Sequence, residues 1–237
     1  MWSLAPPSLA LATGEVHVWR TRLEQPAGLQ ESYLRTLAED ERVRASRFHF
    51  DKHRRHFVVA RGFLRELLAR YLSTTPEAVR FAYGPYGKPL LEGVHRDSTL
   101  RFNASHSGEW AVFAFVQDHE VGVDVEHIKP DFETEGIAER FFSAREVQTL
   151  NALAETEKPA AFFRCWTRKE AYIKAIGSGL SHPLDSFDVT LAPGEPAALS
   201  RAEGWSLFDL DVAPEYAAAL AVAGSEHSLH GFDLRAV

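Results

Sequence analysis

The chain repeats its own sequence pattern at a spacing of 106 residues, and this repeat constrains the fold more than any single motif. Residues 100–116 (LRFNASHSGEWAVFAFV) match residues 206–222 (SLFDLDVAPEYAAALAV). The aligned pairs are Phe102 with Phe208, Glu109 with Glu215, Trp110 with Tyr216, and Val116 with Val222. One match could arise by chance, but a constant spacing over several segments predicts two related halves joined near 117–120.

The two halves differ at polar positions, and these differences predict where a site lies. The first half has His106 where the second has Val212, and the second has Asp124 where the first has His17. We therefore expect an α+β fold of two pseudo-symmetric α/β halves, residues 1–118 and 119–237, with the active site at their interface.

Apolar periodicity predicts the elements of each half. Helices are expected over 32–48, 53–72 and 163–176, and a capping box of Ser143 and Glu146 predicts a further helix start. Strands are expected over 15–20, 79–83, 100–103, 110–116, 121–126, 186–191, 205–211, 216–222 and 228–234.

The amphipathic helix at 163–176 carries Glu170 and Lys174, which are four residues apart and so share a face. Gly177 ends this helix, because glycine readily adopts the left-handed conformation that a helix end requires. An isolated Glu/Lys pair at this spacing is usually a surface ion pair. Cys165 lies within the helix, and we interpret it as a packing residue.

The expected strand at 121–126 (VGVDVE) places Asp124 and Glu126 on one face, since residues two apart on a strand point the same way. Two such carboxylates face either solvent or a cation, and we expect Asp124 to face solvent and to contribute little to packing. Together with Glu170 they supply three carboxylates for Mg²⁺ or Mn²⁺. Lys174 would then contact a phosphate.

These segments resemble a known family. GVDVE at 122–126 and WTRKEAYIK at 166–174 look like the two signature motifs of Sfp-type 4'-phosphopantetheinyl transferases, and the second fits W-x-x-K-E-x-x-x-K without a gap. Further similar motifs are YGKP at 86–89, FNASHS at 102–107, FFS at 141–143 and PLDSF at 183–187. The resemblance runs from about Arg44 to Phe187.

The resemblance implies an enzyme that transfers 4'-phosphopantetheine from coenzyme A to a serine of an apo acyl- or peptidyl-carrier protein and releases 3',5'-ADP. Asp124, Glu126 and Glu170 would hold the metal on the diphosphate, and Lys174 would neutralise the phosphates. Glu170, directly or through a water molecule, would accept the serine proton. Asp124, Glu170 and Lys174 are thus the expected catalytic residues and also contact coenzyme A.

The nucleotide end of coenzyme A is assigned to other residues by the same resemblance. Lys88, Ser105 and His106 would bind it, and Arg44 would hold the 3'-phosphate. Residues 42–70 contain nine Lys or Arg against two acidic residues, a net charge of +7, which leaves −14 for the rest of the chain. This segment could be a solvated helix face or a site for a small polyanion. Arg54, Arg61 and Arg65 are expected to share one of its faces.

Two other functions fit parts of this pattern: a divalent-metal nuclease, and a non-catalytic module that binds coenzyme A. The charge of −14 outside one segment argues against nucleic acid as a partner, and so against the nuclease. A non-catalytic binding module would give the three carboxylates no function. The single cysteine and the absence of an apolar span lead us to expect a cytoplasmic protein that does not contact membranes. A site within one chain needs no second copy, so we expect a monomer.

Overall fold

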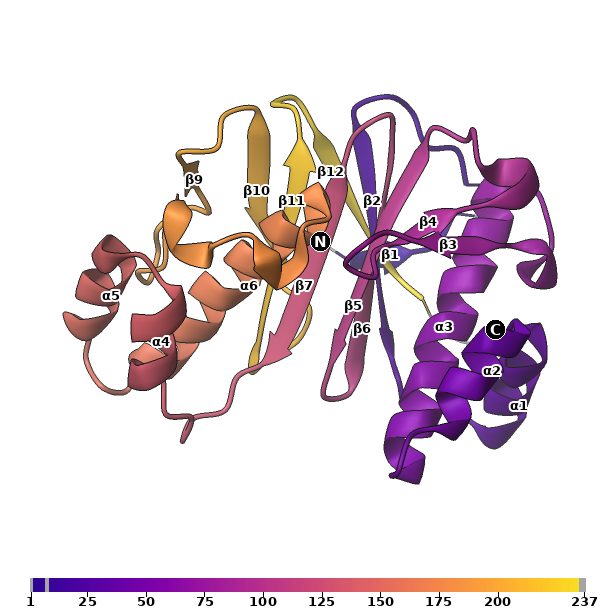
Figure 1. The fold of residues 1–237 in the computed structure, drawn as a ribbon, viewed down its shortest axis with the longest axis horizontal. Coiled ribbons are helices and arrows are strands. Elements are labelled where there is room, and N and C mark those ends of the chain that lie inside the picture. Colours follow the sequence, from indigo (N-terminus) through magenta and orange to yellow (C-terminus); the bar gives the residue numbers. More distant parts are fainter. Residues whose placement is uncertain (1, 7–8, 235–237) are drawn as a thin grey trace.

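Two β-sheets pack face to face at the centre of the molecule, and the long helices lie on their outer faces (Figure 1). The computed structural model describes residues 2–6 and 9–234. The first sheet has the order β1 (Trp2–Leu4), β12 (Ser228–Asp233), β2 (Glu15–Arg22), β6 (Trp110–Gln117), β5 (Leu100–Ser107). The second has the order β10 (Trp205–Asp209), β11 (Tyr216–Ala223), β7 (Val121–His127).

Helices cover the outer face of each sheet. The first sheet is covered by α1 (Ala27–Thr36), α2 (Glu39–Ser46) and α3 (Asp51–Leu72). On the side of the second sheet lie α4 (Glu135–Phe141), α5 (Ala144–Asn151) and α6 (Lys158–Ile176). Two small hairpins complete the sheet structure: β3 (Phe81–Tyr83) with β4 (Pro89–Leu91), and β8 (Asp188–Val189) with β9 (Leu199–Ser200). Single-turn 3-10 helices lie at Pro76–Ala78, Gly93–His95, Gly179–Ser181 and Leu184–Ser186.

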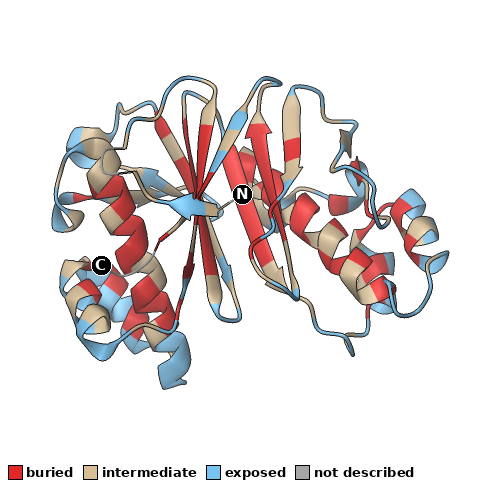
Figure 2. Ribbon diagram, turned by 180° about the vertical axis from the view of Figure 1, so that it is seen from behind, coloured by how far each residue is buried: buried red, intermediate tan, exposed pale blue. Residues whose placement is uncertain are grey.

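The central strands are apolar on both faces because both faces are covered. On β6, Phe113 and Phe115 pack in the core beneath α3, whereas Val112, Ala114 and Val116 pack in the core between the two sheets. Figure 2 shows the resulting distribution, with buried residues concentrated in the central strands and along parts of the long helices.

The strand order confirms the internal repeat. The first sheet contains β2-β6-β5 and the second contains β7-β11-β10, so the same antiparallel three-strand pattern occurs twice. The α+β fold with two similar halves is therefore confirmed. The division at 118/119 stays a prediction. The last strand, β12, does not remain with the second half, because it lies between β1 and β2 in the first sheet.

Several helix and strand limits differ from the predictions. The single helix predicted over 32–48 is wrong: Leu37 and Ala38 are extended, and the chain forms α1 and α2 instead. Leu37 is 2% exposed, so the break places its side chain in the core, and the Glu41 carboxylate accepts a hydrogen bond from the Ala38 amide. The strand predicted over 186–191 shortens to β8. The capping box is confirmed, since Ser143 and Glu146 bond to each other's backbone amides.

Among the described residues, no helix is both long enough and apolar enough to cross a bilayer.

Candidate active site

A glycine sets the distance between β7 and α6, and with it the position of the expected catalytic residues. A Cβ on Gly122 would lie 2.1 Å from the carbonyl oxygen of Ala171 and 2.3 Å from the amide nitrogen of Ala175. Only a glycine therefore allows the helix to pack this closely on the strand. Residues 124 and 126 follow on the same face of β7, so the close contact brings Asp124 to Lys174 at an Nζ–Oδ1 distance of 2.5 Å.

Asp124 is buried rather than facing solvent, with 3% of its surface exposed, so that expectation is wrong. The reason is that α6 covers it from one side and β5 from the other. Its Oδ1 accepts hydrogen bonds from Lys174 Nζ and, at 2.8 Å, from Ser105 Oγ. Its Oδ2 is buried and has no hydrogen-bond partner among the described residues. An acceptor of this kind is costly to leave unpaired, so it suits a cation.

The three carboxylates are close enough to disturb each other's ionisation. Burial first, and then the charges of Asp124 and Glu126, raise the pKa of Glu170 to about 7 against the opposing effect of Lys174. Burial also raises the pKa of Glu126, whose Oε2 accepts a 2.7 Å hydrogen bond from Ser107 Oγ. Such mutual repulsion is relieved when a cation binds between the groups.

The three carboxylates do not form a ready ligand set. Within the described ranges, no three His, Cys, Asp or Glu side chains are arranged so that they could hold a metal ion. Lys174 and Ser107 each engage one carboxylate oxygen, on Asp124 and Glu126 respectively. The metal site therefore stays a prediction that the unpaired Oδ2 and the raised Glu170 pKa support.

Two adjacent cavities lead away from Lys174. The first has a volume of about 190 Å³ and is lined by residues that include Tyr86, Lys174 and Gly177. The second, also about 190 Å³, is lined by residues of β5, α2 and α3. Pro89 and Ala104 line both cavities, so the two adjoin.

The second cavity brings together three of the four residues predicted for the 3'-phosphate and the nucleotide. Arg44, Ser105 and His106 all line it. The Arg44 guanidinium lies 5.2 Å from the centre of the Phe57 ring. Desolvation within the protein and the positive charges of Lys174, His56 and Arg44 lower the pKa of His106. An excess of positive charge around a cavity favours an anionic ligand.

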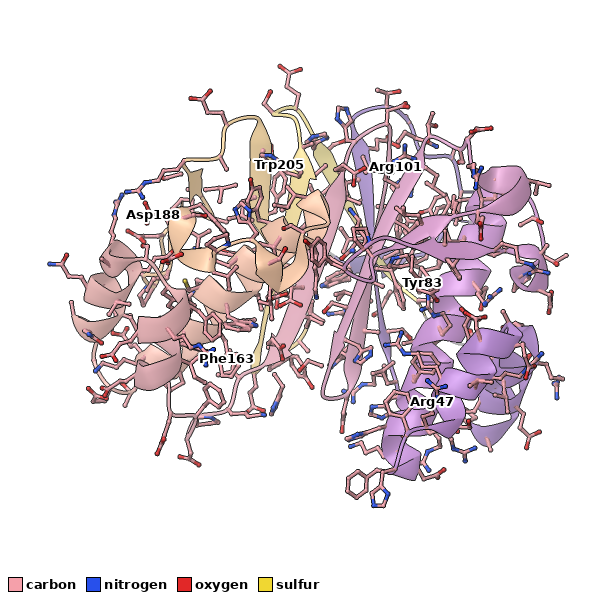
Figure 3. The ribbon with its side chains drawn as sticks, in the orientation of Figure 1. Arg47, Tyr83, Arg101, Phe163, Asp188 and Trp205 are labelled. Atoms are coloured by element: carbon pink, nitrogen blue, oxygen red, sulfur yellow. The ribbon has the colours of Figure 1, made fainter. Side chains whose placement is uncertain are left out.

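Arg61, one of the three arginines predicted to share a helix face, joins Arg44 in this cavity. Its Nε lies 3.2 Å from Glu41, and its guanidinium donates to the hydroxyl of Tyr83, which Figure 3 labels. Arg65 differs: it is 1% exposed and its guanidinium donates to Glu41 and to backbone carbonyls. Arg54 pairs with the exposed Asp51. Arg61 and Arg65 both reach Glu41 and so share a face of α3, whereas the place of Arg54 on that face stays a prediction.

Two other lysines have mainly structural contacts. Lys88 lines the first cavity, but its ammonium donates to Glu120 and to the Ala175 carbonyl, both at 2.7 Å. Its position at the end of α6 makes it a cap of that helix. Lys169 is fully buried and pairs with Glu146 at 2.8 Å. It also donates to the backbone carbonyls of Leu184 and Phe187.

Sequence reasoning missed Ser107 and Gly122, although a signal for each was present. Ser107 lies two residues after Ser105, which puts both on one face of β5. Gly122 interrupts a run of β-branched residues, and a glycine inside a strand often marks the close approach of another backbone.

Comparison with known proteins identifies the family. A model of the 4'-phosphopantetheinyl transferase superfamily matches residues 120–221, and a model of the N-terminal part of 4'-phosphopantetheinyl transferases matches residues 15–118. The 4'-phosphopantetheinyl transferase HetI of a Nostoc species is 43% identical over 223 residues, which cover 94% of each chain. The chain belongs to the 4'-phosphopantetheinyl transferase family.

Other relatives of this transferase agree. The 4'-phosphopantetheinyl transferase Sfp of Bacillus subtilis is 32% identical over 71% of this chain and 74% of its own. Among solved structures, a holo-(acyl-carrier-protein) synthase from Bacillus anthracis, in complex with CoA, is 23% identical, with a TM-score of 0.36 over 46% of this chain and 96% of its own. The family models and the HetI and Sfp matches show that the chain is an enzyme of the transferase class.

Proposed function

We propose that this transferase moves 4'-phosphopantetheine from coenzyme A to a serine of an apo acyl- or peptidyl-carrier protein and releases 3',5'-ADP. One observation carries the proposal: the Lys174–Asp124 pair adjoins a basic cavity formed by the other half of the chain. The two chemical ends of coenzyme A, a diphosphate and a phosphorylated nucleotide, need two such neighbouring sites.

Each end of coenzyme A is assigned to residues of matching chemistry. Arg44 and His106 bind the 3'-phosphate and the nucleotide, because both line the basic cavity. Lys174 lines the adjoining cavity and donates to Ser105 of the basic cavity, and these two residues contact the diphosphate. Lys88 orients the end of α6 and the neighbouring hairpin, which form the wall between these sites. Positioning and charge stabilisation are the main demands of phosphoryl transfer.

Carboxylate oxygens are the ligands that Mg²⁺ and Mn²⁺ prefer, so the proposed metal is one of these two ions. Asp124, Glu126 and Glu170 would hold the ion, and Asp124 Oδ2 is the oxygen without another partner. The bound ion would supply positive charge to the diphosphate.

Glu170 is the proposed acceptor of the carrier serine proton. A general base works best when its pKa lies near the operating pH. Without a bound cation, burial and the neighbouring carboxylates raise the pKa of Glu170 to about 7, which meets this condition at neutral pH. A cation held by the same carboxylates would lower this pKa, so the ligand and base functions compete for one side chain.

The test is a transfer assay. The protein is incubated with coenzyme A, MgCl₂ and an apo carrier protein, and the carrier is examined by mass spectrometry. The expected result is a carrier heavier by one phosphopantetheine, with equimolar 3',5'-ADP detected by chromatography. Cleavage of an added oligonucleotide without any gain in carrier mass would favour the nuclease. Binding of coenzyme A without either product would favour the non-catalytic module.

A further inference from the structure

The two sheets meet at the edge strands β5 and β7, and side chains rather than a backbone ladder join these strands. Within the described residues, β5 pairs with β6 alone and β7 with β11 alone. Three polar residues share the face of β5 toward β7: Asn103, Ser105 and Ser107. Each of them hydrogen-bonds to β7. This polar seam therefore connects the first half to the strand that carries the candidate metal ligands.

Ser107 makes two of the contacts in the seam. Its hydroxyl donates to Glu126 Oε2 at 2.7 Å and accepts from the His127 amide at 3.2 Å. The amide fixes the serine oxygen relative to β7, so the hydroxyl proton points at the Glu126 carboxylate. Asn103, four residues earlier on β5, makes a similar contact. Its Oδ1 accepts a hydrogen bond from the Val123 amide at 3.0 Å.

We propose that Ser107 is a positioning residue that holds the Glu126 carboxylate in the orientation needed to bind the divalent cation. The inference rests on the proposed function, in which Glu126 is one of the ligands. Glu126 is near the end of β7 and is less enclosed than Asp124. Without a fixed donor its side chain is free to adopt other rotamers, and an ordered ligand binds a cation more tightly than a mobile one. Metal affinity in the second half thus depends on a residue of the first half.

The experiment compares Ser107→Ala with Ser107→Thr, which keeps the hydroxyl, and with Ser206→Ala as a matched control. Ser206 is a partly buried strand serine that donates to the Gly224 carbonyl on the edge strand of the second sheet, away from the carboxylates. Binding of Mn²⁺ is measured by electron paramagnetic resonance of the free ion, with coenzyme A present in every sample. Exchange of the His127 amide for deuterium is measured in the metal-free proteins.

For Ser107→Ala we expect Mn²⁺ affinity to fall about tenfold, in line with the loss of one hydrogen bond to a charged group. The Michaelis constant for Mg²⁺ rises by a similar factor while kcat at saturating Mg²⁺ changes less than about twofold. The His127 amide exchanges faster. Ser107→Thr and Ser206→Ala behave as the wild type in Mn²⁺ binding.

Unchanged Mn²⁺ affinity in Ser107→Ala would overturn the proposal, as would an equal loss in Ser206→Ala. If the wild type binds no Mn²⁺ at all, the positioning function falls with the metal site. The wild-type transfer assay then reports separately whether phosphopantetheine transfer stands, so the two failures are distinguishable.

Discussion

At the scale of single residues, Glu170 is the group whose ionisation the fold changes most clearly among the carboxylates of the site. Its pKa is raised to about 7 by burial and by neighbouring negative charge. In the metal-free protein the native state therefore binds this proton more tightly than the unfolded state does. The stability that this group contributes accordingly falls as pH rises from the ordinary glutamate pKa toward 7.

This loss of stability with rising pH gives a prediction for Glu170→Gln. Without metal, the variant should be more stable than the wild type at pH 8, by about 1–3 kcal/mol, because a buried carboxylate has been removed. Near pH 4, where Glu170 is protonated, the two proteins should have similar free energies of unfolding. The variant should lose transfer activity at every pH. Urea unfolding at both pH values measures the effect. An equal difference at pH 4 and pH 8 would show that Glu170 does not titrate as described.

The burial of Asp124 changes what its substitution should do. Lys174 lies against its Oδ1, so Lys174→Met leaves a buried carboxylate with one partner fewer. We expect this variant to lose on the order of 2–3 kcal/mol of stability in addition to its activity. The double variant Asp124→Asn/Lys174→Met should recover part of that loss, which a double-mutant cycle measures by thermal unfolding. Strict additivity of the two single variants would mean that the pair does not interact.

Arg44 lies in the cavity assigned to the 3'-phosphate, and a ligand pair tests this assignment. Coenzyme A and its 3'-dephospho form differ by that one phosphate. Loss of a charge-assisted hydrogen bond lowers affinity by about tenfold or more, so the wild type should prefer coenzyme A by this factor. In calorimetric titrations, Arg44→Ala should lower the affinity for coenzyme A and leave the affinity for dephospho-coenzyme A nearly unchanged. A coupling energy near zero would assign the phosphate to His106 or Arg61.

At the scale of elements, the sequence predicted what local patterns determine and missed what tertiary packing determines. Alternation on β7 correctly put Asp124 and Glu126 on one face, and helical spacing put Glu170 beside Lys174. The burial of Asp124 followed only from the close packing of α6 and β5, which no local pattern reveals. The break at Leu37 was missed because the helical periodicity continues across it, whereas the core takes Leu37 in an extended conformation.

The segment between β7 and α5 is a candidate docking surface for the carrier protein, which we expect to be acidic around its serine. Lys129, Arg140 and Arg145 are exposed, and Arg140 lies 5.2 Å from the centre of the Phe141 ring. Reversing both arginine charges to Glu should raise the Michaelis constant for the carrier by about fivefold or more and leave that for coenzyme A within about twofold. Steady-state kinetics with each substrate varied separately test this, and unchanged carrier kinetics would move the surface elsewhere.

At the scale of the whole molecule, β12 is the element that the first half takes from the end of the chain. Phe232 of β12 packs against Trp19, with their ring centres 4.7 Å apart. Leu234, which follows the strand, belongs to the same core. Removal of residues 226–237 should therefore abolish the cooperative thermal transition, because a strand inside the first sheet is lost. Adding the missing segment as a peptide should restore it, and a truncated chain that unfolds like the wild type would contradict the pairing.

The place of β12 also has a consequence for how the protein is made. A ribosome releases the first half of the chain well before the last strand, and domains usually fold in the order of synthesis. Here the first half cannot complete its sheet when it emerges, since β12, one of the two partners of β2, is still untranslated. The nascent chain must hold an open strand edge until β12 has been made. Maturation of the first half is thus postponed until β12 leaves the exit tunnel.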